Sequence, residues 1–366
     1  MGSSALSSLI ERLGGDPKPA VLSHVSGSWG PLEGRFGYET RSLAAALAGY
    51  GLSAGSSAAV VGKEGYGTLC GAIAIVAAGA TVVSIDTAAS DDALRRALAT
   101  TGAVHAIASD ERQLARILAL RPELPALELV LLIAASPSER KPAALLVPAA
   151  IEVGSAALAE DPDLLRSGLA EDAAGAACVL VDGRGEARPT SRAALCALAD
   201  ALGTAMGIKP GTTVLSGLSV GSVERLGVAL AALGRQATLL LPDPAERPDL
   251  GLGPRSPDSI LLDVASLERL YRAWLEDIHA KSLLGRAATR WALRQADASG
   301  RGNWKHRLAE RVALRGLRDK LGGRTSTLHV IATARGGASS EVESFFRAVG
   351  LTVLYLSPGT GAALAR

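Results

Sequence analysis

The chain alternates short apolar or β-branched runs with longer segments rich in Ala and Leu over most of its length. The first series has expected helices at residues 41–50, 68–78, 91–100 and 111–120 and expected strands at residues 58–61, 81–85, 104–108 and 127–133. The second series has strands at residues 176–181, 213–215, 237–241 and 259–264 and helices at residues 192–206 and 224–233. Strands joined through helices pair in parallel, because a crossover returns each strand to the same direction. The pattern predicts an α/β protein of two stacked βαβ subdomains with mainly parallel sheets.

Three stretches between these series indicate how the domains are organised. Residues 136–148 and 242–257 are rich in proline and are expected to be loops, and residues 161–172 are acidic and form the best internal boundary. We therefore expect a first subdomain at residues 1–170 and a second at residues 171–366. The second is expected to carry a helical, basic insert at residues 267–321.

Composition and length restrict the class of protein. The 366 residues are 48% hydrophobic and 20% charged, which is typical of a folded globular chain and not of a disordered one. The longest apolar run, residues 69–85, is interrupted by glycine and is short for a membrane span, so we read it as a buried helix followed by a buried strand. The first ten residues lack the basic start of a secretory signal. A cytoplasmic location is expected. Only seven of the 38 basic residues are lysine, which favours a bacterial, GC-rich genome.

The cysteines and histidines suggest structural roles. Cys70, Cys178 and Cys196 have no metal-ligand spacing and lie in apolar runs, so we expect buried free thiols in a reducing compartment. The five histidines share no catalytic or zinc-binding spacing. No catalytic residue and no metal ligand is predicted from these residue types.

Positive charge is concentrated in residues 281–324, which hold 12 Lys or Arg against three acidic residues. Arginines recur every four residues there, which places each set on one helix face: Arg286, Arg290 and Arg294, then Arg307, Arg311 and Arg315. With Trp291 and Trp304 nearby, these faces are expected to contact an anionic membrane surface or an acidic protein partner. The alternative is an ordinary solvated helix face. No nucleic-acid-binding module is recognisable, so no nucleic acid is expected.

The end of the chain carries a family resemblance. The motif Gly336-Gly337-Ala338, the pair Phe345-Phe346 and the run Tyr355-Leu356-Ser357-Pro358-Gly359-Thr360 follow one another at the spacing found in long-chain acyl-CoA synthetases of the adenylate-forming superfamily. Residues 36–55 and 74–83 resemble earlier segments of the same family, so the likeness covers roughly residues 35–361. It implies the large N-terminal domain of those enzymes, with ATP and magnesium as cofactors. It also implies that the glycine turn lies against adenine and that Thr360 occupies the family threonine position.

The resemblance also marks departures from the family pattern. The segment at the family's phosphate-binding loop contains Gly183, Arg184, Gly185 and Arg188 but lacks the Ser/Thr cluster, which favours an ordinary turn between strand and helix over a loop that binds ATP in the family manner. At residues 218–225, serine replaces the family histidine, and Glu224-Arg225 is expected to be either a helix cap with a surface ion pair or a catalytic feature. Gly361 lies where the family has its magnesium-binding glutamate.

These departures predict a degenerate, non-catalytic member of the family without the C-terminal lid domain, a pseudoenzyme that binds a protein partner, an acyl ligand or a membrane surface. Its vestigial nucleotide site would comprise Gly183, Arg184, Gly185, Arg188, Gly336, Gly337, Ala338 and Thr360. The alternative is an ATP-dependent fatty acyl-CoA ligase or acyl-AMP synthetase with a divergent site or a separately encoded lid. ATP and magnesium are expected as cofactors only if that activity is retained.

Overall fold

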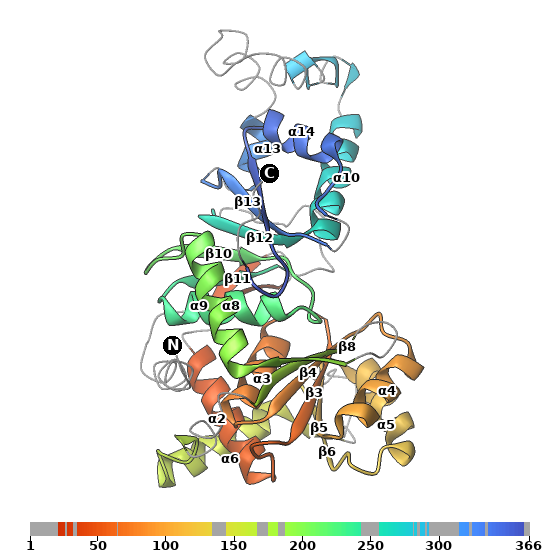
Figure 1. The fold of residues 1–366 in the computed structure, drawn as a ribbon, viewed down its shortest axis with the longest axis vertical. Helices are drawn as coiled ribbons and strands as arrows, with labels where there is room; N and C mark the ends of the chain where they lie inside the picture. Colours follow the sequence, from red (N-terminus) through yellow and green to blue (C-terminus); the bar gives the residue numbers. More distant parts are fainter. Residues whose placement is uncertain are drawn as a thin grey trace. The chain divides into compact units, whose positions relative to one another are not determined.

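The computed structural model describes residues 21–25, 28–31, 35–63, 65–133, 144–166, 175–181, 187–242, 256–280, 282–283, 286–289, 291–292, 315–321, 324–333 and 336–361. In this part of the chain, strands alternate with helices, and the strands form two seven-stranded sheets, A and B (Figure 1). Contacts divide the chain into two units. Unit 1 consists mainly of Pro31–Asp200 and Ser219–Gly234, and unit 2 mainly of Ala201–Leu218 and Arg235–Arg366. The predicted α/β class with mainly parallel sheets is confirmed.

Sheet B belongs to unit 1 and has the strand order β7-β6-β5-β3-β4-β8-β9. Its strands are β3 (Ser57–Gly62), β4 (Thr81–Asp86), β5 (Ala103–Ala108), β6 (Leu129–Leu132), β7 (Leu145–Leu146), β8 (Ala176–Val181) and β9 (Ala187–Ser191). The helices of this unit are α2 (Phe36–Gly49), α3 (Tyr66–Ala77), α4 (Asp91–Thr101), α5 (Glu111–Leu120), the short η1 (Arg121–Glu123), α6 (Val147–Glu160) and α9 (Val223–Gly234). Its neighbouring strands pair in parallel, except that β8 and β9 are antiparallel.

Helices cover both faces of sheet B, as a doubly wound sheet requires (Figure 1). Leu94 of α4 and Ile117 of α5 pack with Val61 and other small apolar side chains on one face. On the other face, α3 approaches so closely that a Cβ on Gly71 would lie 3.0 Å from the side chain of Ile107. Ser90 accepts a hydrogen bond from the N–H of Ala93 and so caps the start of α4.

The contact between α2 and α6 depends on a glycine. A Cβ placed on Gly154 would lie 1.7 Å from the backbone oxygen of Ser42, so no larger residue fits without separating the helices. The hydroxyl of Tyr38 donates to that of Ser155 at 2.7 Å beside this contact. The sequence did not predict α6, because its first residues were assigned to a proline-rich loop.

Sheet A has the order β14-β13-β12-β10-β11-β1-β2 and lies mainly in unit 2. Its strands are β1 (Val21–Val25), β2 (Ser28–Pro31), β10 (Thr213–Ser216), β11 (Thr238–Leu241), β12 (Ser259–Asp263), β13 (Thr327–Ile331) and β14 (Thr352–Leu356). The helices of this unit are α10 (Val264–Ala280), α13 (Arg315–Asp319) and α14 (Ser340–Ala348), and α8 (Arg192–Ala205) joins the two units along the chain. The five strands from β14 to β11 pair in parallel.

The core of unit 2 is built on α10 and α14, which pack over one face of sheet A. Trp274 of α10 is fully buried, and its ring lies 5.6 Å from that of Phe346 on α14. Leu262 of β12 and Val330 of β13 belong to the same cluster. Aromatic side chains are scarce in the chain, and several of them gather here because they supply large buried surfaces.

Two structural details differ from the sequence predictions. Residues 187–191 form a strand, β9, where a loop was expected, and this strand pairs with β8 in the antiparallel sense. Contacts also group β8, β9 and α9 with unit 1, whereas the sequence suggested a boundary near residue 170. The reason is that β8 pairs with β4, so the chain returns to the first sheet after the acidic segment.

Candidate functional site

The carboxyl ends of parallel strands in sheet A meet at one edge, where open α/β sheets bind their ligands. The turn at residues 336–338 follows β13, and the turn at residues 357–361 follows β14, the neighbouring strand. Four residues predicted for the nucleotide site are therefore brought to adjacent strand ends: Gly336, Gly337, Ala338 and Thr360. We call these two segments the β13 turn and the β14 turn.

The β13 turn is fixed by backbone hydrogen bonds. The N–H of Thr333 donates to the carbonyl of Gly336, and the N–H of Gly336 donates back to Thr333, both at 2.9 Å. The hydroxyl of Thr333 also donates to the Gly336 carbonyl at 2.9 Å. Gly336 has a φ of +104°, which side chains rarely allow, and it is exposed. The turn thus presents backbone atoms to the surface.

The end of the β13 turn is held by two side chains. The N–H of Ala338 donates to the hydroxyl of Tyr355 at 2.9 Å, and Tyr355 itself is buried in β14. Ser339 then caps α14 by accepting from the N–H of Val342. The turn is consequently tied to both the neighbouring strand and the following helix.

The β14 turn is closed by two glycines in the left-handed conformation. Gly359 has a φ of 72° and Gly361 a φ of 63°, and the N–H of Gly361 donates to the carbonyl of Ser357 at 2.9 Å. Thr360 between them is exposed. Gly361 offers no side-chain oxygen, so the residue present at the family's magnesium position does not fit a magnesium ion.

Asp263 is a carboxylate at the same edge that sequence reasoning missed. It ends β12 and accepts from the N–H of Ser266 at 2.6 Å, so it caps the start of α10. The hydroxyl of Ser266 donates to the carbonyl of Gly217, and Arg269 donates to that hydroxyl. An acidic residue directly after an apolar strand was the available signal.

The predicted phosphate-loop residues lie in unit 1. Gly183, Arg184 and Gly185 fall outside the described residues. Arg188 is exposed on β9, opposite Leu180 of β8, and therefore belongs to an edge strand instead of a loop.

The pair Glu224-Arg225 contradicts the surface alternative, because both side chains are buried at the start of α9. The hydroxyl of Ser222 donates to the Glu224 carboxylate at 2.5 Å. The Arg225 guanidinium donates to the hydroxyl of Thr68 at 3.2 Å and to the carbonyl of Gly65 at 3.3 Å. The pair thus joins α9 to the start of α3, which sequence spacing could not reveal.

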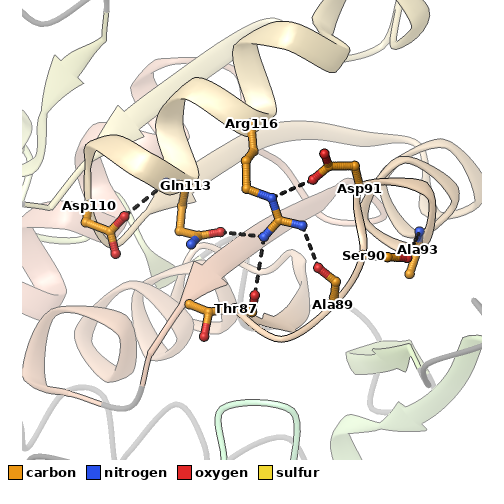
Figure 2. A network of polar contacts seen from close by, with 8 residues as sticks. All are labelled: Thr87, Ala89, Ser90, Asp91, Ala93, Asp110, Gln113 and Arg116. Carbon is orange, nitrogen blue, oxygen red and sulfur yellow. Dashed lines mark hydrogen bonds and ion pairs between the residues drawn. The ribbon is translucent and has the colours of Figure 1, made fainter. Parts of the chain in front are cut away.

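At the carboxyl edge of sheet B, one arginine organises the loop between β4 and α4 (Figure 2). Arg116 of α5 donates to the carboxylate of Asp91 at 2.6 Å, to the amide oxygen of Gln113 at 2.8 Å and to the carbonyls of Ala89 and Thr87. Its side chain is only 17% exposed. The loop is therefore stabilised by the Arg116 side chain, which hydrogen-bonds the carbonyls of Thr87 and Ala89.

The buried thiols are poorly suited to nucleophilic chemistry. Burial raises the pKa of Cys70 to about 12, and burial raises the pKa of Cys178 to about 11, with Glu224 contributing. Cys196 is partly exposed, so the expectation of full burial holds for two of the three cysteines. Within the described ranges, no group of three or more His, Cys, Asp or Glu side chains could hold a metal ion.

The basic residues predicted to contact a membrane or partner are mostly beyond the described ranges. Arg290, Arg294, Arg307 and Arg311 fall outside them, Arg286 is half-buried, and Arg315 begins α13. None of the described helices is long and apolar enough to cross a membrane.

Comparison with solved structures defines the class of fold. The A domain of carboxylic acid reductase from Segniliparus rugosus, in complex with AMP and a co-purified carboxylic acid, matches with a TM-score of 0.66 at 14% identity over 100% of this chain and 61% of that chain. A long-chain-fatty-acid-CoA ligase from Archaeoglobus fulgidus matches with a TM-score of 0.65 at 11% identity over 97% of this chain and 63% of that chain. This is the fold of the N-terminal domain of adenylate-forming enzymes.

A sequence comparison gives a match over part of the chain. Residues 35–163 match the model of the AMP-binding enzyme family, and elsewhere the likeness to the solved structures is one of fold. The adenylation domain of a Mycobacterium chelonae carboxylate reductase gives a TM-score of 0.66 at 15% identity, over 100% of this chain and 60% of that chain. The chain thus spans about three fifths of the length of these structures. Among curated protein sequences, none matches it significantly.

Proposed function

We propose that this chain binds an adenine nucleotide at the carboxyl edge of sheet A and does not by itself form acyl adenylates. The observation that carries the proposal is the pair of turns at adjacent strand ends, where glycine conformations expose backbone atoms and Gly361 replaces a carboxylate. A flat purine ring can approach such a backbone closely, because no Cβ intervenes.

The match of residues 35–163 to the AMP-binding enzyme family supports nucleotide binding. One structure of similar fold, the Segniliparus rugosus domain, holds AMP. The β13 turn retains Gly336, Gly337 and Ala338, the residues that the family resemblance assigns to adenine. ATP or AMP is therefore the ligand class that the turn fits best.

The β14 turn supports the non-catalytic part of the proposal. Adenylate formation builds negative charge on phosphate oxygens, and a magnesium ion held by anionic oxygen normally offsets it. Gly361 is buried and left-handed, with its N–H bonded to Ser357. A glutamate at this position would strain the left-handed backbone, and its side chain would need space that the buried glycine does not occupy.

A second candidate is an ATP-dependent acyl-CoA ligase or acyl-AMP synthetase that acts on fatty acids with a divergent site or a separately encoded lid. It is favoured by the buried arrangement of Ser222, Glu224 and Arg225, where the family has a functional segment. Burial of charged side chains costs free energy of desolvation, so the buried Glu224 and Arg225 indicate a role in folding or function.

Two assays on the purified chain separate these candidates. Calorimetric titration with AMP and with ATP–Mg²⁺ measures binding, and pyrophosphate release with fatty acids of several lengths measures adenylation. We expect saturable nucleotide binding and no acid-dependent pyrophosphate. Acid-dependent pyrophosphate release would establish the ligase instead, and the absence of any nucleotide binding would overturn the proposal.

A variant pair locates the binding. Gly336→Val forces a β-branched side chain into a φ of +104° and should abolish nucleotide binding. Gly316→Ala in α13 of the same unit meets no neighbour within 4 Å and should bind like the wild type. Equal affinity in both variants would place the nucleotide elsewhere.

The basic residues add a separate proposal, contact with an anionic membrane surface or an acidic partner. It is supported by the charge pattern of Arg307, Arg311 and Arg315, and salt-sensitive sedimentation with anionic vesicles tests it. Reversal of these three charges should abolish sedimentation. Sedimentation that survives the reversal would contradict the proposal.

A further inference from the structure

We infer that Tyr355 is a positioning residue that fixes the β13 turn for nucleotide binding, an inference that rests on the proposed function. The tyrosine lies in β14, and its hydroxyl accepts a hydrogen bond from the N–H of Ala338, 17 residues earlier in the chain. The contact therefore ties the β13 turn to β14, the strand that leads into the β14 turn.

The ring of Tyr355 is held firmly. The residue is 3% exposed and belongs to the buried cluster of unit 2. Within the sheet it is paired with Val330 of β13, three residues before Thr333, whose backbone bonds to Gly336 of the β13 turn. Because the ring is set by the core and the register, the position of its hydroxyl is set as well.

The hydroxyl in turn fixes the last peptide of the β13 turn. Ala338 is partly buried against the same cluster, so its N–H needs a partner, and Tyr355 supplies one at 2.9 Å. The start of the turn is closed locally by Thr333 and Gly336. Tyr355 thus links the turn to the sheet, whereas the hydrogen bonds between Thr333 and Gly336 are local to the turn.

This link matters for binding because a ligand gains affinity when the backbone that it touches is already in the bound conformation. The amide of Ala338 is occupied by the phenol and is not a donor for the nucleotide. Its role is indirect: it holds the glycines before it in place. A tyrosine hydroxyl two residues before the β14 turn is thereby connected to the conformation of the β13 turn.

The test compares two tyrosine-to-phenylalanine variants in the same unit. Tyr355→Phe keeps the buried ring and removes the acceptor of the Ala338 N–H. Tyr271→Phe is the matched control, because the Tyr271 hydroxyl donates to the Glu341 carboxylate on α14 at 2.8 Å and does not contact the turn. Unfolding midpoints of both variants are recorded so that a general loss of stability is visible.

We expect Tyr355→Phe to weaken AMP binding about fivefold, the loss of roughly one neutral hydrogen bond, and Tyr271→Phe to leave it unchanged. Hydrogen exchange at the Ala338 amide, measured without nucleotide, should accelerate in Tyr355→Phe alone. Wild-type affinity in Tyr355→Phe, or unchanged exchange at Ala338, would overturn the inference while leaving the proposed function intact. Failure of the wild type to bind AMP would instead overturn the proposed function.

Discussion

The loops at the carboxyl edges of the two sheets are stabilised in different ways. In unit 1, the loop after β4 is held by the side chain of Arg116, which occupies two loop carbonyls and the Asp91 carboxylate (Figure 2). In unit 2, the turns after β13 and β14 are closed by left-handed glycines and backbone hydrogen bonds. The described loop after β4 has two of its carbonyls paired with an arginine side chain, whereas the turns of unit 2 leave Gly336 and Gly359 exposed.

This difference indicates where a ligand belongs. A loop whose polar groups are already paired has little to offer a nucleotide, and its arginine contributes to folding. A glycine-rich turn at the end of a parallel strand has backbone within reach of a ligand and no side chain in the way. The comparison is consistent with the proposed function, in which the turns of sheet A bind the nucleotide and the Arg116 contacts of sheet B stabilise the fold.

The largest expected effect tests how tightly unit 1 is packed. Gly154→Ala places a methyl group 1.7 Å from the Ser42 oxygen, so the helices α2 and α6 must separate. We expect a loss of about 3 kcal/mol or more in the free energy of unfolding, measured by chemical denaturation. The control is Gly203→Ala in unit 2, where the added methyl meets only the guanidinium of Arg235, a flexible group that can move. A similar loss in both variants would contradict the argument.

The next effect tests how much the Arg116 side chain stabilises the loop between β4 and α4. Arg116→Ala removes a guanidinium that is only 17% exposed, together with its bonds to Asp91, Gln113 and the loop carbonyls. We expect destabilisation by about 2 kcal/mol with unchanged affinity for AMP, by denaturation and calorimetry. Arg95→Ala, which removes an exposed arginine paired with Asp92, should change stability little. Weaker AMP binding in Arg116→Ala would break the comparison.

A smaller effect is expected at the β14 turn. Gly361→Ala forces a side chain into a φ of 63° and should destabilise the protein by about 1 kcal/mol. Gly316→Ala, in the helix α13, should have the opposite sign and stabilise it by about 0.5 kcal/mol. Thermal unfolding of both variants measures this. A stabilising Gly361→Ala would show that the left-handed turn is not required.

The smallest effect is a pH dependence shared by both units. Burial lowers the pKa of His105 in unit 1 and of His329 in unit 2. Burial favours the neutral form of His329, in which Nε2 carries the proton towards the Ala205 carbonyl and Nδ1 can accept from the Ser259 hydroxyl. The unfolded chain binds protons first, so stability is complete above pH 6.5 and falls as the pH decreases towards the folded-state pKa values.

Each histidine can lower the free energy of unfolding by at most about 0.7 kcal/mol between pH 6.5 and 6.0. The reason is that a difference of one bound proton between the unfolded and folded states changes this free energy by about 1.4 kcal/mol per pH unit. Denaturation at a series of pH values measures the slope. His329→Gln should reduce it by up to half. A slope that is unchanged in His329→Gln would show that this histidine does not titrate as described.

Local signals in the sequence predicted much of the fold. The caps of helices are of this kind, because the Ser90 side chain accepts from the N–H three residues later, a purely local contact. The alternating pattern located most strands of both sheets. The strand β9 was missed because its segment was interpreted as a phosphate-binding loop or an ordinary turn. Pro189 fits this strand because β9 lies at the edge of sheet B, where proline is tolerated.

Long-range contacts could not be predicted in this way. The motif located the β13 turn, but that Tyr355 accepts from Ala338 depends on how β13 and β14 are paired. The burial of Glu224 and Arg225 depends on the approach of α9 to α3, which no spacing within either segment encodes. The closeness of Gly154 to Ser42 likewise appears only when two helices are packed.

Hydrogen exchange with and without AMP tests the central claim most directly, because it reports both sheet edges in one experiment. We predict that AMP slows exchange in the turns at residues 336–338 and 357–361 and leaves the loop at residues 86–90 of unit 1 unchanged. Protection of the unit 1 loop with no change in either turn of unit 2 would contradict the account.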